Sequence, residues 1–203
     1  TEDKTRYGIN PFGVSLAVAR NLLKADRGTR FIEVDQYGWD HHNGIYEEGR
    51  GSYGLFVQAT ELDLGLSALI DDLAAAPGSV AGKSVLDETI IVVIGEFGRT
   101  VGELNRARGR DHYPYAFSGL FLGGGVKGGR VVGATDDKGA GIVDFGWEHK
   151  RAIYFTDVVT TIYSAMGIDW TKTVSDTPSG RIFKYTEIDA DVDTDSREIA
   201  PLF

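Results

Sequence analysis

The apolar positions of this chain follow two patterns, one typical of helices and one typical of strands. The clearest helical pattern predicts a helix over residues 52–76, ended by Pro77-Gly78. A second amphipathic helix is predicted over residues 11–25, because Asn10 is a good N-cap and Pro11 suits the first helical position. The stripe of the longer helix recurs every three or four residues: Leu55, Ala59, Leu62, Leu66, Leu69 and Leu73.

Two details refine the predicted helices. Gly65 interrupts the apolar helix and costs about 1 kcal/mol against alanine, so it marks a close packing contact. A third helix is predicted to begin at Thr156-Asp157 and to end at Gly167.

Short runs of β-branched and apolar residues predict strands at 31–34, 89–94, 117–122 and 130–133. The run from Thr89 to Ile94 is apolar throughout, which is typical of a strand buried on both faces of a parallel sheet. Together with the helix over 52–76, strands 31–34 and 89–94 would form a right-handed β-α-β unit. We therefore predict an α/β fold with a mostly parallel sheet.

Composition and charge narrow the class of partner. The chain has 203 residues, enough for one domain or a large part of one, and a formal net charge of -9. This charge argues against nucleic acid or an anionic membrane surface as the main partner. No apolar run approaches 18 residues, so no membrane span is expected, and the absence of cysteine excludes thiolate metal sites. Because the chain begins at Thr1 on a polar segment, we expect a processed protein or a fragment of a longer one.

Polar side chains that can bind metals follow the first predicted strand, in Gly38-Trp39-Asp40-His41-His42-Asn43. Ligands of open α/β sheets bind outside the carboxyl ends of the strands. Asp40 and His42 are two residues apart, so in an extended segment both side chains leave on the same side. These residues therefore predict a metal site. The alternative is a polar turn in which Asp40 bonds its own backbone and the histidines face solvent.

Two further polar clusters follow later in the chain. Glu96 and Arg99 come directly after strand 89–94, and either serve a site or form an ion pair that closes the turn. The pair Asp111-His112 alone would indicate a surface hydrogen bond, and it suggests a site only together with the other polar clusters. The run Gly123 to Gly129 lacks the pattern of a phosphate loop, and instead predicts a glycine-rich hairpin into strand 130–133.

The order of four motifs is specific in combination. Gly-Trp-Asp-x-His at 38–42 is followed by Glu-Phe-Gly-Arg-Thr at 96–100, Gly-Arg-Asp-His-Tyr at 109–113 and Gly-Gly-Gly-Val-Lys-Gly-Gly at 123–129. With Asn-Pro-Phe-Gly near the start and Gly-Arg at 180–181, the chain closely resembles the uncharacterised domain of unknown function 1501 family. That family belongs to the alkaline phosphatase/sulfatase-like superfamily.

The resemblance implies a three-layer α/β/α sandwich, alkaline-phosphatase-like, with a mostly parallel sheet that is incomplete in this chain. Residues 1–203 would be the C-terminal part of one sulfatase/phosphatase-like domain. Its partner would be the N-terminal part of the same protein, as a missing segment or a second chain, which would supply another aspartate and the nucleophile. Export signals in the family imply a periplasmic or extracellular location.

The resemblance also implies roles for individual residues. Asp40 and His42 would bind one divalent metal, to which His112 returns, and Glu96 would stand at a further ligand position. Phe97 replaces a histidine of the superfamily motif, which departs from a complete two-metal site. As catalytic residues, Arg99 would bind an oxyanion of the substrate and Asp111 would orient His112. Histidines with carboxylates favour Zn²⁺ or Mn²⁺, with Ca²⁺ or Mg²⁺ as alternatives.

Two functions follow from this interpretation. The first is a metal-dependent hydrolase-like domain that acts on phosphate or sulfate esters, with an anionic small molecule or glycan as substrate. The second is a non-catalytic binding or structural domain of a secreted or surface assembly on the same fold, because fold does not dictate function.

Overall fold

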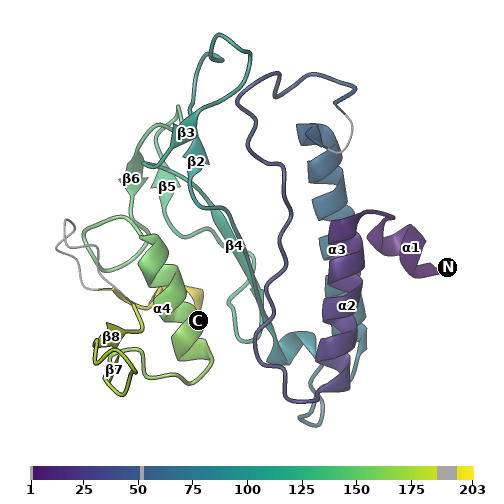
Figure 1. The fold of residues 1–203 in the computed structure, drawn as a ribbon, viewed down its shortest axis with the longest axis vertical. Coiled ribbons are helices and arrows are strands. Elements are labelled where there is room, and N and C mark those ends of the chain that lie inside the picture. The colour runs from purple at the N-terminus through teal and green to yellow at the C-terminus, as the bar shows by residue number, and fades with distance from the viewer. Residues whose placement is uncertain (1, 51–52, 187–195) are drawn as a thin grey trace. The chain divides into compact units, whose positions relative to one another are not determined.

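The computed structural model describes residues 2–50, 53–186 and 196–203. Within it the chain divides into two units, Thr1–Gly125 and Val126–Phe203 (Figure 1). The first unit carries three helices and the motifs at 38–42, 96–100 and 109–113, so it holds every predicted site residue.

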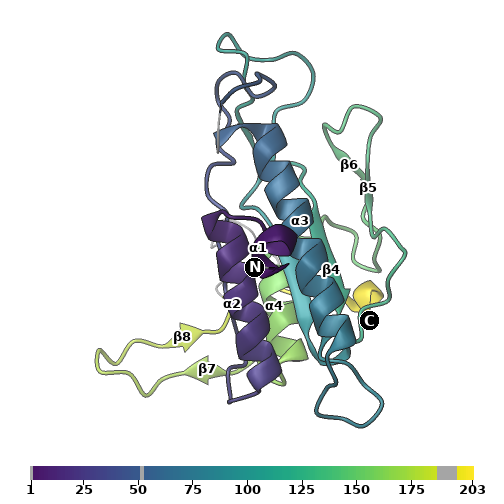
Figure 2. The same cartoon turned by 90° about the vertical axis from the view of Figure 1, so that its right-hand side faces the viewer.

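The helices of the first unit are α1 (Glu2–Tyr7), α2 (Pro11–Ala25) and α3 (Leu55–Ala75). Helices α2 and α3 lie side by side (Figures 1 and 2). The side chain of Asn10 accepts a hydrogen bond from the backbone N–H of Gly13 at 2.8 Å, so the predicted N-cap is confirmed. The helices predicted over 11–25 and 52–76 are both present, although residue 52 lies outside the described residues.

A core of six buried side chains joins these three helices: Tyr7, Phe12, Leu16, Ala68, Leu69 and Leu73. Gly65 of α3 faces this core. A Cβ atom at Gly65 would lie 2.8 Å from Cδ1 of Leu16 and 3.4 Å from Cε1 of Phe12. The helix interior therefore has glycine where side chains of α2 approach closely, and the predicted packing contact is confirmed.

A polar network lies beside this core and centres on Asp72. Its carboxylate accepts hydrogen bonds from the hydroxyl of Tyr7 and from Nη1 of Arg20, both at 2.8 Å, and from Arg6. Arg20 also binds Asp3. Burial raises the pKa of Asp72, but the hydrogen bonds from Arg20, Arg6 and Tyr7 outweigh it and lower the pKa to about 2. The network thus ties α1 and α2 to α3 through one ionised carboxylate.

The sheet contradicts the predicted fold class. Strand β1 (Ile90–Ile94) pairs with β4 (Gly119–Gly123) in antiparallel register, with Ile90 opposite Gly123 and Ile94 opposite Gly119. Every residue of β1 is half-buried rather than covered on both faces. The described residues form four two-stranded antiparallel sheets, so the three-layer α/β/α sandwich with a mostly parallel sheet is wrong for this chain.

The predicted strand at 31–34 explains part of this error. Residues 31–34 form no strand pairing, so the β-α-β crossover is also wrong. The segment alternates between exposed and half-buried positions, and Val34 packs against the helical core instead of entering a sheet. An apolar run predicts an extended segment, but the pattern does not contain the identity or direction of its partner.

Shorter strands form three further pairs. β2 (Gly98–Arg99) pairs with β3 (His112–Tyr113), and β5 (Ala134–Thr135) pairs with β6 (Ile142–Asp144). β7 (Thr173–Val174) pairs with β8 (Phe183–Lys184). The strand predicted at 117–122 corresponds to β4, whereas the hairpin into a strand at 130–133 is wrong, because that segment is irregular. Short 3₁₀ turns occupy Leu86–Glu88 and Ala200–Leu202.

The second unit is organised by α4 (Phe155–Ala165). Asp157 is fully buried in its first turn, where it accepts hydrogen bonds from Nη1 and Nη2 of Arg151 at 2.7 and 2.8 Å and from the backbone N–H of Tyr154 at 2.7 Å. The backbone N–H of Arg197 also donates to Asp157 at 2.8 Å. One carboxylate thus caps α4 and fixes the C-terminal segment to it. No helix in the described ranges is long and apolar enough to cross a membrane.

Candidate metal centre

Helix α3 holds the segment that carries Asp40. The Nε2 amide of Gln58, which is buried, donates a hydrogen bond to the carbonyl of Tyr37 at 2.8 Å. Gly38 follows with a φ of 99°, and a Cβ there would lie 2.3 Å from Nε2 of Gln58. A side chain at this position would therefore be strained and would also displace the anchoring amide.

The two neighbouring histidines of this segment have different surroundings. His41 is buried, with Nε2 3.2 Å from the carbonyl of Tyr53. His42 is half-buried and turns toward a second segment, the hairpin formed by β2 and β3. The alternative in which both histidines face solvent is therefore wrong for His41.

The loop between β2 and β3 lies directly against His42. The backbone N–H of Arg110 donates to the carbonyl of His41 at 2.9 Å, and Asn43 and Arg108 form an isolated antiparallel bridge. A Cβ at Gly109 would lie 2.0 Å from the carbonyl carbon of His42. This close approach requires glycine, and it brings residues about 70 positions apart in the chain into contact.

Three donor atoms meet where these segments join. Oδ1 of Asp40, Nε2 of His42 and Nε2 of His112 lie 3.0 Å from one another in every pairing. Donor atoms around a tetrahedral Zn²⁺ at about 2.0–2.1 Å lie roughly 3.3 Å apart, so the spacing fits a shared metal with a small outward adjustment. Over the residues that the structure describes, this is the one group of three or more such side chains close enough to share an ion.

Asp111 fixes the orientation of His42. Its Oδ1 atom lies 2.9 Å from Nδ1 of His42, on the side of the ring opposite Nε2. Metal-binding histidines commonly donate their second ring N–H to a carboxylate in this way. The hydrogen bond from His42, and a second one from Asn105, lower the pKa of Asp111. The sequence placed Asp111 beside His112, whereas its hydrogen bond goes to His42.

Asn105 belongs to the site and was missed by sequence reasoning. Its Nδ2 amide donates to the carbonyl of His42 at 3.0 Å and to Oδ1 of Asp111 at 2.9 Å. A single amide in a loop has no periodicity, and the arginines and small residues that follow it, at positions 106–109, are typical of an exposed turn. Only its distance of six residues from Asp111 could have drawn attention to it.

Arg99 forms an ion pair with the candidate ligand Asp40. Its Nη1 atom is buried and lies 2.7 Å from Oδ1 of Asp40, although the angles at this contact are not those of a hydrogen bond. His112 first, and Arg99 second, lower the pKa of Asp40 to about 2, so Asp40 is ionised at neutral pH. The predicted alternative, an ion pair of Arg99 with Glu96, does not form. Glu96 is exposed, and its carboxylate is not among the three gathered donor atoms.

Phe97 gives the site an apolar wall. Its ring centroid lies 4.1 Å from that of His112, and the guanidinium carbon of Arg99 lies 5.6 Å from the Phe97 ring centroid. Phe97 therefore packs against His112 and offers no donor atom to the site. The site is nevertheless open to solvent, because the side chain of Asp40 is 63% exposed.

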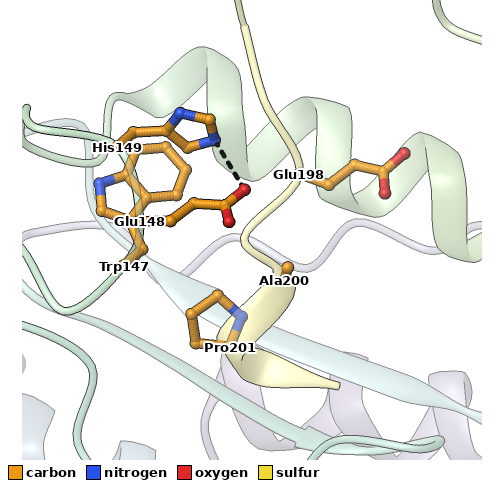
Figure 3. A pocket seen from close by; sticks show the side chains of 6 residues that line it. All are labelled: Trp147, Glu148, His149, Glu198, Ala200 and Pro201. Carbon is orange, nitrogen blue, oxygen red and sulfur yellow. Dashed lines mark ion pairs between the residues drawn. The ribbon is translucent and has the colours of Figure 1, made fainter.

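A separate cavity of about 280 Å³ lies in the second unit (Figure 3). Nε2 of His149 lies 3.6 Å from Oε1 of Glu148, and the His149 ring meets Trp147 edge-on. The carboxylate of Glu198 already accepts a hydrogen bond from Nε1 of Trp170 at 3.1 Å. None of the predicted site residues lines this cavity, whose walls are Trp147, Glu148, His149, Glu198, Ala200 and Pro201.

Comparison with known proteins yields one result. No curated protein and no solved structure matches the chain. A family described as a protein of unknown function, DUF1501, matches residues 1–195, which include all three residues of the candidate metal centre. The chain therefore belongs to the DUF1501 family of proteins of unknown function.

Proposed function

We propose that this chain is a metal-dependent hydrolase-like domain that acts on phosphate or sulfate esters. The observation that carries the proposal is the triangle of Asp40 Oδ1, His42 Nε2 and His112 Nε2, with sides of 3.0 Å. Asp111 holds the far side of the His42 ring, so that Nε2 faces the triangle. We also propose that this site is like the metal site of the alkaline phosphatase/sulfatase-like superfamily, because the order of the sequence motifs suggested these three residues as its metal ligands.

Two imidazoles and one carboxylate favour Zn²⁺ or Mn²⁺, and Ca²⁺ or Mg²⁺ are the weaker alternatives. A divalent metal held there would act as a Lewis acid toward an ester oxygen of the substrate. Three protein ligands leave a coordination position for substrate or water, as in catalytic rather than structural zinc sites. Glu96 is exposed after β1 and lies outside the triangle, so it is proposed only as an additional ligand.

Arg99 is proposed to bind a non-bridging oxygen of the ester. Its guanidinium lies beside Asp40, and within the described residues its buried Nη1 atom forms no hydrogen bond. A planar guanidinium matches two oxygens of a tetrahedral phosphate or sulfate. Asp111 acts on the reaction through His42 rather than on the substrate itself.

The nucleophile is a further part of the proposal. In the described ranges no serine or threonine hydroxyl forms a hydrogen bond with the side chain of Asp40, His42 or His112. We propose that a water molecule, or a hydroxyl from an N-terminal part of the same protein or from a second chain, attacks the ester. The same observation favours the second function, a non-catalytic domain of a secreted or surface assembly that retains an anionic glycan through Arg99.

The test measures metal binding and turnover separately. Binding of Zn²⁺, Mn²⁺, Mg²⁺ and Ca²⁺ is titrated calorimetrically, and hydrolysis of aryl phosphates and aryl sulfates is followed with each of these metals. Asp40→Asn should lower metal affinity and turnover together, because it removes a charged ligand. Asp35→Asn, an exposed carboxylate of the same segment, is the matched control and should change neither.

Three results separate the functions. Metal-dependent turnover that Asp40→Asn abolishes supports the hydrolase. Metal binding without turnover of either ester, together with retention of a sulfated glycan that Arg99→Ala abolishes, supports the non-catalytic domain. A wild-type chain that binds none of the four metals would refute both the metal centre and the hydrolase.

A further inference from the structure

Asn105 uses its whole hydrogen-bonding capacity within the site. Nδ2 donates to the carbonyl of His42 and to Oδ1 of Asp111, at 3.0 and 2.9 Å. Oδ1 accepts from the backbone N–H groups of Ala107 and Gly109, also at 3.0 and 2.9 Å. A side-chain amide has two N–H donors and one oxygen with two lone pairs, so nothing is left over.

These four contacts fix which way the amide faces. With nitrogen and oxygen exchanged, the oxygen of Asn105 would face a carbonyl and a carboxylate, and its nitrogen would face two N–H groups. All four contacts would then be repulsive. Hydrogen-bond networks of this kind are the accepted basis for assigning amide orientation. The donor side of Asn105 therefore points at Asp111.

The donor side of Asn105 constrains Asp111 and, through it, His42. Oδ1 of Asp111 accepts from Asn105 and lies 2.9 Å from Nδ1 of His42. Since an ionised carboxylate only accepts hydrogen bonds, Nδ1 of His42 must carry the proton. Oδ1 of Asp40 lies 3.0 Å from Nε2 of His42 as an ion pair without a hydrogen bond, unlike Asp111 at Nδ1. In the neutral ring Nε2 therefore keeps its lone pair, and it also lies 3.0 Å from Nε2 of His112.

We propose that Asn105 is a positioning residue that, through Asp111, selects the Nδ1–H tautomer of His42 and so makes Nε2 available to a metal. This inference rests on the proposed metal centre and assigns a role to a residue that touches neither metal nor substrate. Aspartate could accept from Ala107 and Gly109 but could not donate to Asp111. Asparagine is therefore suited to connecting the loop to the carboxylate–histidine pair, because it both donates and accepts.

Asn105→Asp is the sharpest variant. It retains the size of the side chain and the oxygen that accepts from Ala107 and Gly109, so the loop keeps its internal hydrogen bonds. It removes the donor to Asp111 and places a second negative charge beside it. Asn21→Asp makes the same chemical change on the exposed surface of α2, where Oδ1 accepts from Nε of Arg20 at 3.1 Å, and is the matched control.

The tautomer is read directly from the metal-free 203-residue chain. Long-range ¹H–¹⁵N correlation of the imidazole rings distinguishes a protonated from a bare ring nitrogen. The chain has four histidines, so His42→Asn identifies the signals of His42 by their loss. Zn²⁺ affinity is measured in parallel by competition with a chelator of known affinity, for the wild type, Asn105→Asp and Asn21→Asp.

The expected result is a proton on Nδ1 of His42 in the wild type and in Asn21→Asp. In Asn105→Asp this preference should be lost, and Zn²⁺ affinity should fall by roughly 10- to 100-fold, as for other residues behind a metal ligand. A wild-type His42 protonated on Nε2 would overturn the inference, as would Asn105→Asp with an unchanged tautomer. If Asn105→Asp fails to fold, Asn105→Ala, which also removes the donor to Asp111, is measured in its place with the same expected result. Failure of the wild type to bind any metal would instead refute the proposed function. The tautomer of His42, which is measured without metal, would still test the role of Asn105.

Discussion

Replacing Gly65 by alanine should have two opposite effects on stability, a gain in helix propensity and a loss from overpacking of the core. In a helix interior alanine is more favourable than glycine by about 1 kcal/mol. The added Cβ, however, would lie 2.8 Å from Cδ1 of Leu16 and 3.4 Å from Cε1 of Phe12, against about 3.5–4.0 Å for an optimal carbon contact. Both neighbours belong to the buried core, so neither can move without disturbing others.

The overpacking should outweigh the gain in helix propensity. Inserting a methyl group into a packed core costs about 1–3 kcal/mol. Subtracting the gain for alanine leaves a net loss of stability of about 1 kcal/mol for Gly65→Ala. For a domain of this size that corresponds to a fall in melting temperature of about 2–4 °C.

Urea unfolding followed by far-ultraviolet circular dichroism, with a thermal melt, measures the effect. Ser67→Ala, two residues further on and exposed on the same helix, is the control and should stay within about 0.5 kcal/mol of the wild type. A Gly65→Ala variant more stable than the wild type by about 1 kcal/mol would show that propensity alone operates. The described approach of α2 to α3 would then be wrong.

Two further predictions concern charges. The pKa of Asp72 is about 2 against an ordinary value of 3.8, so its contribution to stability is complete above pH 3.8 and is lost as the pH falls toward 2. The free energy of unfolding should therefore depend less steeply on pH across that window in Asp72→Asn, but not in Asp71→Asn, which changes an exposed neighbour. Equal slopes in the wild type and both variants would contradict the network. Arg99→Lys keeps the charge but loses the planar guanidinium. Inorganic phosphate or sulfate should therefore bind more weakly to the metal-loaded protein, while its Zn²⁺ content stays unchanged. Loss of Zn²⁺ in this variant would instead assign Arg99 to the metal centre itself.

The helices could be predicted because their signals are local. The stripe along α3, the N-cap at Asn10 and even the packing contact at Gly65 are encoded within a few turns. The sheet could not be predicted, because the order of helix and strand suggested that β1 pairs in parallel with the earlier segment 31–34. Its partner is instead β4, which follows β1 in the chain. An apolar run such as Ile90–Ile94 satisfies a half-buried antiparallel pair as well as a central parallel strand.

The candidate site was likewise predictable from the sequence only in part. The motif order suggested that Asp40, His42 and His112 belong together, and the structure brings their donor atoms together. The contacts around them depend on the loop between β2 and β3. Its path decides that Asp111 meets His42 rather than His112, that Arg99 faces Asp40 rather than Glu96, and that Asn105 enters at all. None of these contacts follows from spacing in the sequence.

The separation of the donor residues along the chain has a consequence for folding. Asp40 and His112 are 72 positions apart in the chain, and helix α3 and strand β1 lie between them in the sequence. An ion bound by both would act as a non-covalent crosslink across a long loop, and it would stabilise the native state by mass action, about 4.1 kcal/mol at a free metal concentration 1,000 times the dissociation constant. The concentration of available metal would then set how often the loop between β2 and β3 opens from the rest of the first unit, so the same ion would govern local opening as well as chemistry.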